Sequence, residues 1–176
     1  MLQSLLDLAE MVSGGALDRL IKYNWEMNKK LKKGISMKVK LQEILEALEG
    51  AGMEIEYYYD TKNQEILMIF DGMVNGEYNP ELLDEISEGF IEDYIPLPRQ
   101  YDINEYRIME GFIYELPEGR NQEILEQAIR GKGAFRRFKD RLYDLGLEQK
   151  WYKYRDDSYE RIARDWCERF RIEIEE

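Results

Sequence analysis

The sequence predicts an α+β fold that is mostly helical and contains one small antiparallel β-sheet. The sheet is expected because residues 53–59 and 65–70 place apolar side chains on either side of a polar turn, as the two strands of a β-hairpin do. The helical part is expected because the other long segments repeat their apolar residues every three or four positions. At 176 residues the chain is long enough to bury a core without disulfides or metal ions.

The first 36 residues are expected to form a helical appendage to a single α+β domain at residues 37–176. Their apolar residues follow helical spacing, and the cations at 29–33 suit the end of a helix. Such an appendage could pack on the domain, pair with a second copy to give a homo-oligomer, or come from a gene model that starts too far upstream. We expect the domain to fold without it.

Before residue 120 the pattern predicts a short helix, the hairpin and two further helices. Residues 39–48 indicate the first helix, and Asn79-Pro80 is typical of the start of the next one. Residues 95–98 (Ile-Pro-Leu-Pro) are expected to be extended, because a residue that precedes proline avoids the helical region. Asp102 and Glu105 resemble a capping box at the start of a helix.

After residue 120 the pattern predicts three or four helices and a short final strand at 170–174. Gly146 stands where a left-handed residue ends a helix, and Asp157 is a candidate N-cap for the last one. Large aromatic side chains recur at helical spacing. Four of them are expected to be buried and to hold the C-terminal helices to the sheet, namely Phe135, Phe138, Trp151 and Trp166.

Composition excludes several classes of function. The chain has no histidine, which rules out every catalytic arrangement with a histidine base. Its single cysteine, Cys167, rules out an intrachain disulfide and a zinc site of Cys and His ligands, and this usage suits the cytoplasm. The net charge of −12 argues against a general nucleic-acid binder, and no apolar run is long enough to cross a membrane. We predict no catalytic residue, metal site or cofactor.

Acidic residues concentrate in the middle of the chain. Residues 51–119 carry seventeen Asp and Glu against three Lys and Arg. Glu54 and Glu56 could form a carboxylate pair for acid–base chemistry or for Mg²⁺. The alternative, which we favour, is that they belong to the solvated face of a half-buried sheet.

Basic residues concentrate in the stretch Gly131–Leu142. The candidate residues for binding an anion or a partner are Lys132, Arg136, Arg137 and Lys139, with Arg155 downstream. In one interpretation, Gly131 and Gly133 expose backbone N–H groups at a helix start and the cations complete an anion site. In the other, the glycines allow a tight turn, and the arginines pair with the acidic middle of the chain or with a protein partner.

The same stretch carries a family resemblance. The run Gly131–Asp140, followed by Trp151, Arg155 and Trp166, resembles the bacterial uncharacterised protein family numbered 0158. Residues 37–44 resemble the way in which members of that family begin, so that the resemblance covers about residue 37 to the C-terminus. It implies a bacterial, soluble protein. The family has no established activity, and no catalytic residue can be transferred from it.

Three functions compete. The one that we favour is a non-enzymatic interaction or regulatory domain with an unidentified protein partner. The second is binding of nucleic acid or a phosphorylated ligand, which an open cationic groove lined by Trp151 and Tyr154 would support. The third is a metal-dependent enzyme that uses only carboxylates, which would require carboxylates converging in a cleft.

Overall fold

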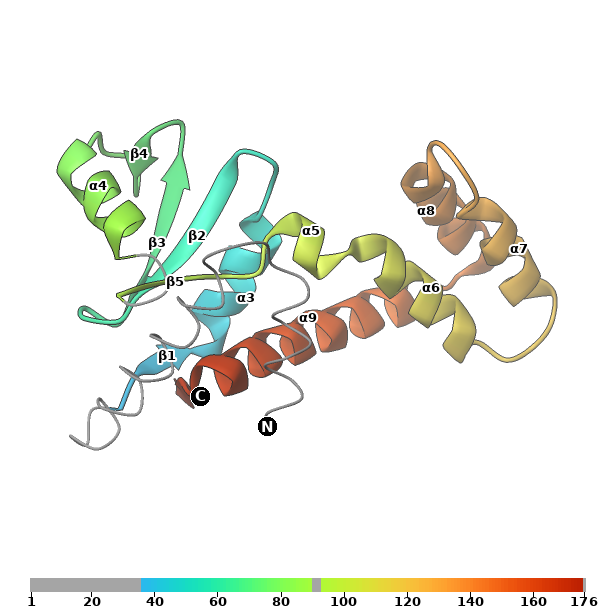
Figure 1. Ribbon diagram of the computed structural model, residues 1–176. Helices are drawn as coiled ribbons and strands as arrows, with labels where there is room; N and C mark the ends of the chain where they lie inside the picture. Colours follow the sequence, from blue (N-terminus) through green and yellow to red (C-terminus); the bar gives the residue numbers. More distant parts are fainter. Residues whose placement is uncertain (1–35, 90–92, 176) are drawn as a thin grey trace, which may run out of the picture.

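The computed structural model describes residues 36–89 and 93–175 and confirms the α+β fold. A four-stranded sheet occupies one end of the molecule, and helices α7 (Arg120–Ala128) and α8 (Ala134–Leu145) occupy the other (Figure 1). Helix α9 (Glu148–Phe170) runs between the two ends, accompanied over part of its length by α6 (Glu105–Glu115) (Figure 1). None of the described helices is long and apolar enough to cross a membrane.

The four-stranded sheet is antiparallel and contains the predicted hairpin. Its strand order is β4 (Met73–Val74), β3 (Glu65–Phe70), β2 (Ile55–Asp60) and β5 (Tyr94–Pro96). The hairpin turn is fixed by Asp60, whose carboxylate accepts hydrogen bonds from the backbone N–H groups of Lys62 and Asn63 at 2.7 and 3.1 Å. The extended conformation predicted for residues 95–98 is confirmed at its start by β5, which pairs with β2.

A second, two-stranded sheet joins the two ends of the described chain. Strand β1 (Lys38–Lys40) pairs in parallel with β6 (Glu173–Glu175). The prediction of a terminal strand is therefore confirmed, although the strand starts at Glu173 and Phe170 still belongs to α9. The assignment of Val39 to a helix is wrong. Val39 lies at the centre of β1 and is buried opposite Ile174. Of the predicted appendage, residues 1–35 lie outside the described residues, and Ser36 hydrogen-bonds to Glu173 at 2.9 Å.

Two of the remaining helices, α3 (Leu41–Gly50) and α4 (Pro80–Glu88), lie largely where the sequence predicts. The single turn α5 (Gln100–Ile103) was not predicted. Asn79 caps α4 by accepting a hydrogen bond from the N–H of Leu82, as predicted. The capping box assigned to Asp102 and Glu105 is wrong, because Asn104 caps α6 and Asp102 instead accepts from the N–H of Arg99 within α5.

Helix α9 is continuous through Asp157, where the sequence suggested a new start. Its buried residues recur at helical spacing along both halves, so packing outweighs the local capping signal. Near its C-terminal end, Trp166 packs edge-on against Tyr59 of β2 and donates its indole N–H to the carbonyl of Pro96 at 2.9 Å. This contact holds α9 to the sheet.

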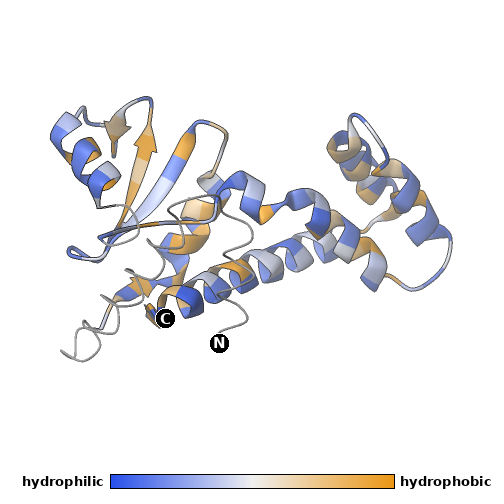
Figure 2. Cartoon of the chain, in the orientation of Figure 1, coloured by the Kyte–Doolittle hydropathy of each residue, from blue (hydrophilic) through white to orange (hydrophobic). Residues whose placement is uncertain are grey.

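The aromatic core at the helical end has a different partner. Phe138 and Trp151 pack edge-on against Phe112 of α6, at ring-centroid distances of 6.2 and 5.4 Å. Phe138, Trp151 and Trp166 are buried as predicted, but the first two hold the helices to one another and not to the sheet. Hydrophilic and hydrophobic residues intermingle along these helices (Figure 2), and Phe112, Phe138 and Trp151 are among the buried ones.

The prediction that Phe135 is buried is wrong. Its side chain is 42% exposed, because Ala134, Phe138 and Leu142 already form the buried stripe of α8 at four-residue spacing. Phe135 lies one position beside that stripe.

Candidate binding surface at the helical end

The turn between α7 and α8 depends on its two glycines. Gly131 and Gly133 have φ angles of +74° and +79°, a region that glycine enters without steric cost. Gly133 is also the N-cap residue of α8, and a β-carbon there would come within 3.2 Å of the Arg137 guanidinium. The glycines therefore allow the tight turn that one of the two sequence interpretations required.

Arg137 is committed to this turn. Its guanidinium donates to the backbone carbonyls of Ala128, Arg130 and Lys132 at 3.0, 2.6 and 2.5 Å, with a longer contact to Gly131. One of these carbonyls, that of Ala128, belongs to the last residue of α7, where the helix supplies no further N–H group to bond it. The expected pairing of Arg137 with the acidic middle of the chain is thus replaced by a local bond to the backbone.

The other cations of the stretch face solvent. Lys132, Arg136 and Lys139 are exposed, as is Arg130, and none forms an ion pair with another described residue. Arg136 therefore also lacks the acidic partner that was expected. The reason is distance, because the acidic strands and α4 lie at the opposite end of the molecule (Figure 1). In the same helix Arg141 does pair, with Asp144 at 2.7 Å.

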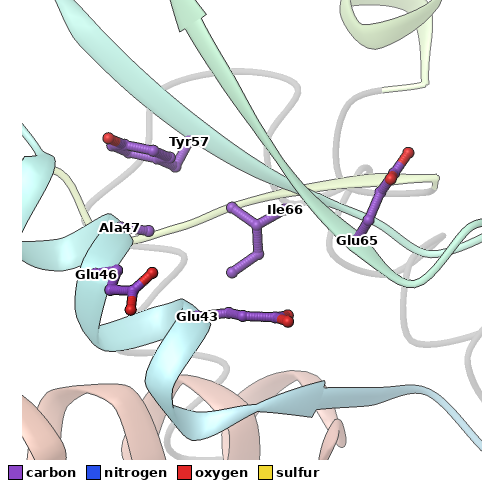
Figure 3. A pocket seen from close by; sticks show the side chains of 6 residues that line it. All are labelled: Glu43, Glu46, Ala47, Tyr57, Glu65 and Ile66. Carbon is purple, nitrogen blue, oxygen red and sulfur yellow. The ribbon is translucent and has the colours of Figure 1, made fainter. Parts of the chain in front are cut away.

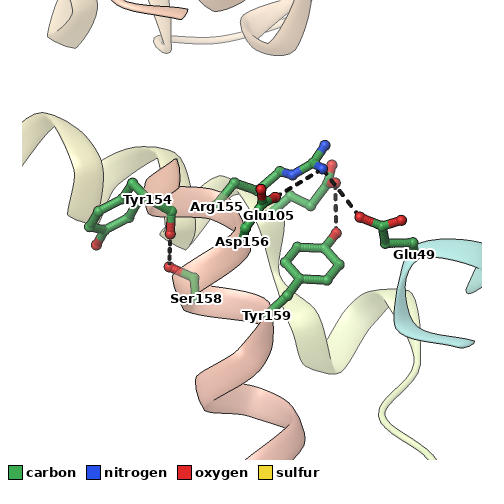
Figure 4. Close-up of polar contacts among 7 residues, drawn as sticks. All are labelled: Glu49, Glu105, Tyr154, Arg155, Asp156, Ser158 and Tyr159. Carbon is green, nitrogen blue, oxygen red and sulfur yellow. Dashed lines mark hydrogen bonds and ion pairs between the residues drawn. The ribbon is translucent and has the colours of Figure 1, made fainter. Parts of the chain in front are cut away.

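Arg155 is half-buried at the junction of α9, α6 and α3. Its Nη2 atom lies 3.3 Å from Glu49 and 3.2 Å from Asp156, and its guanidinium lies 5.7 Å from the ring centre of Tyr159 (Figure 4). The Tyr159 hydroxyl donates to Glu105 at 3.0 Å, and burial together with that carboxylate raises the pKa of the Tyr159 phenol.

The Nε atom of Arg155 is buried and has no hydrogen-bond partner among the described residues. Leaving such a donor unpaired costs about 1–3 kcal/mol, and more when the group is charged. Because the atom is buried, an acceptor from outside could reach it only after the Arg155 side chain had moved.

Three helices enclose a cavity of about 140 Å³ beside these residues. Phe135 and Lys139 of α8 and Tyr152 of α9 are its exposed lining residues. The rest of the lining is Glu105, Met109, Phe138, Leu142, Glu148, Trp151 and Arg155. The structure thus brings together Lys139 and Arg155, two of the five predicted binding residues, at one cavity. We call this feature, with the exposed cations Lys132 and Arg136 of the same stretch, the α8–α9 surface.

The aromatic platform that nucleic-acid binding would favour is not formed by Trp151 and Tyr154. Trp151 is only 7% exposed, and Tyr154 packs against Phe112 with a ring-centroid distance of 5.6 Å. Tyr152, which the sequence did not single out by itself, is 49% exposed instead. The exposure of Phe135 could have been predicted from the sequence, because Ala134, Phe138 and Leu142 already complete a buried stripe at four-residue spacing without it.

A second hollow lies at the other end and is acidic. It has a volume of about 410 Å³ and is lined by Glu43, Glu46 and Glu65 around Ala47, Tyr57 and Ile66 (Figure 3). Among the described residues, no group of three potential ligands is placed to hold a metal ion. Of the two carboxylates considered as a possible pair, Glu56 forms an ion pair with Arg99 at 3.1 Å and Glu54 is exposed.

The one thiol of the chain is also in the core. Cys167 is 2% exposed, and burial raises the pKa of its thiol to about 11. It is therefore protonated and inaccessible at neutral pH, which is the opposite of what a catalytic nucleophile needs.

Comparison with known proteins places the chain in a family. The model of an uncharacterised protein family, UPF0158, matches residues 35–175. The chain belongs to this family. The match includes the whole basic stretch and all the described strands and helices of this UPF0158 member. No curated protein and no solved structure matches it.

Proposed function

We propose that this UPF0158 member is a non-enzymatic interaction domain that binds a protein partner through the α8–α9 surface. The observation that carries the proposal is Phe135, a large aromatic residue that is 42% exposed at a cavity, close to Arg136 and Lys139, which form no ion pair with another described residue. Aromatic residues and arginine are the residue types that dominate binding energy at protein interfaces. Phe135 and Tyr152 would supply apolar contact area, and Arg136 and Lys139 would supply orientation.

The chemistry of the chain supports a role without catalysis. It has no histidine, and its only thiol is buried with a raised pKa. The strongest polar contacts of the basic stretch, those of Arg137, are used to hold the turn between two helices. The proposal therefore assigns no catalytic residue to this protein.

The test is affinity capture of the tagged full chain from its own cell extract, with and without nuclease. We expect captured proteins to be lost when Phe135 and Tyr152 are both changed to alanine. Tyr143→Ala is the matched control, because Tyr143 is a 76% exposed aromatic residue of the same helix that does not line the cavity. Capture that is equal for all three proteins would contradict the proposal.

Binding of nucleic acid or of a phosphorylated ligand is the second candidate. It is favoured by Lys132, Arg136 and Lys139, which carry no ion pair among the described residues. The test is binding of short single- and double-stranded DNA and RNA by the wild type and by the Arg136→Ala, Lys139→Ala variant. Arg137 is left in place because its substitution would disturb the turn. Micromolar binding that salt weakens steeply and the variant loses would favour this candidate over the first.

A further inference from the structure

We propose that the ligand of the α8–α9 surface is a short acidic segment of a partner protein, with one aromatic or leucine side chain seated in the cavity. This inference rests on the proposed function and specifies the chemistry of the partner. The residues next to this apolar side chain in the bound segment would be Asp or Glu, and their carboxylates would face Lys139 and Arg136. The size of the cavity and the charges around it each support this inference.

The size of the cavity fits one apolar side chain. An apolar cavity of about 150 Å³ in another protein binds benzene, so a volume of about 140 Å³ accommodates one aromatic ring or a leucine side chain. The floor is apolar, because Met109, Phe138 and Leu142 are all buried residues that line it. Phe135 stands at the edge and would cover an inserted side chain.

The charges place the carboxylates outside the cavity. Glu105 and Glu148 line the cavity, so a carboxylate inserted between them would meet like charge. At the rim, Lys139, whose side chain also lines the cavity, and Arg136 lie on the exposed side of α8 with no ion pair to another described residue. An apolar anchor flanked by acidic residues satisfies both conditions, whereas the flanking residues of a basic segment would meet like charge at Lys139 and Arg136.

The field of the whole protein restricts an acidic segment to this end. Residues 55–89, which form most of the sheet and α4, carry nine acidic residues and one basic residue. Residues 120–145, which form α7 and α8, carry seven basic and four acidic residues. Helix α6, which also lines the cavity, carries three acidic residues and one basic residue, so the positive surface of this end is limited to α7 and α8. Beyond a Debye length of about 8 Å each end acts by itself, so an acidic segment is repelled at the sheet and attracted on the α8 side of the cavity.

Arg155 also lines the cavity, but its charge is already engaged, because Nη2 lies 3.3 Å from Glu49 and 3.2 Å from Asp156. The cations left for an incoming segment are therefore Lys139 and Arg136, which form no ion pair with another described residue.

The experiment selects ligands from a library of short random peptides displayed on phage, with the immobilised full chain as the target. We expect the enriched peptides to share an aromatic residue or leucine next to Asp or Glu. In fluorescence anisotropy, a selected peptide should bind Lys139→Glu about tenfold more weakly than the wild type, because one attractive charge becomes repulsive. Selection against Lys139→Glu should in turn enrich lysine or arginine beside the anchor.

The matched control is Arg169→Glu, a charge reversal at an exposed position in the last turn of α9, near the sheet. It should leave peptide affinity unchanged, and thermal unfolding of both variants shows that they are folded. No enrichment, enrichment of uncharged or basic peptides, or equal binding by Lys139→Glu would overturn the inference. Self-association in sedimentation that Lys139→Glu abolishes would also overturn it, since the ligand would then be a second copy.

Failure of this inference can be told apart from failure of the proposed function. If alanine at Phe135 and Tyr152 abolishes capture from the extract but no acidic motif is enriched, the surface stands and only the chemistry of the ligand is wrong. If capture is unaffected by those substitutions, the proposed function itself fails.

Discussion

Replacing Arg137 by alanine should destabilise the protein by about 2–3 kcal/mol. The substitution removes three short hydrogen bonds, from the guanidinium to the carbonyls of Ala128, Arg130 and Lys132. Hydrogen bonds to charged groups contribute about 1.5–3 kcal/mol each when desolvated, but these lie partly in solvent, so about 1 kcal/mol each is appropriate. Such a loss is a large part of the 5–15 kcal/mol by which a typical domain is stable.

Urea unfolding followed by far-ultraviolet circular dichroism measures this effect. With a slope of about 1–3 kcal/mol per molar urea, the midpoint should fall by roughly 1–2 M. Arg136→Ala provides the control. Arg136 precedes Arg137 in the same helix, but it is exposed and forms no ion pair with another described residue. Its effect should stay within about 0.5 kcal/mol.

Arg137→Lys refines the test. An ammonium group cannot present the planar fork that reaches three carbonyls at once, so lysine should recover less than half of the lost stability. If Arg137→Ala and Arg136→Ala shift the midpoint equally, or if lysine restores it fully, the guanidinium does not hold the turn between α7 and α8 and the reasoning fails.

Three further predictions concern the core, pH and the N-terminal segment. Phe138→Ala should cost about 3–5 kcal/mol in urea unfolding, whereas Phe135→Ala should cost less than about 1 kcal/mol because that ring is 42% exposed. Burial raises the pKa of Tyr59 to about 12 and of Cys167 to about 11, so the free energy of unfolding should fall as the pH rises above about 9. Cys167→Ala should flatten that fall, and an unchanged slope would contradict it. A chain that begins at Met37 should fold and keep its unfolding midpoint, and insolubility would show that residues 1–36 are integral.

The hairpin was predictable because its signals are local. Apolar alternation, a polar turn and an Asp at the turn all fall within residues 55–70, and the paired strands are neighbours in the sequence. Strand β1 was not predictable in this way. Its three residues sit directly before α3, and the strand exists only because β6, more than 130 residues later, lies beside it.

Only part of the candidate site was predictable from the sequence, and its location in the fold was not. The sequence identified Lys139 and Arg155, yet it could not show that α6, α8 and α9 enclose a cavity between them. Helical periodicity also marks a face only to within about one residue, which is why Phe135 was assigned to the core. Ala134 occupies the buried position on α8 that the periodicity assigned to Phe135, so Phe135 is exposed.

Arg136 and Arg137 show how one basic run separates into two roles. They are consecutive, so their side chains leave α8 about 100° apart. That rotation turns Arg137 back toward the carbonyls at the end of α7, where its charge is used within the molecule, and leaves Arg136 in solvent. Because Arg136 forms no ion pair with another described residue, its charge can bind an acidic group from outside. Charge reversal at Arg136 should therefore weaken binding of an acidic ligand without changing the free energy of unfolding. Substitution of Arg137 should lower the free energy of unfolding, and it should affect binding only because the fold is disturbed.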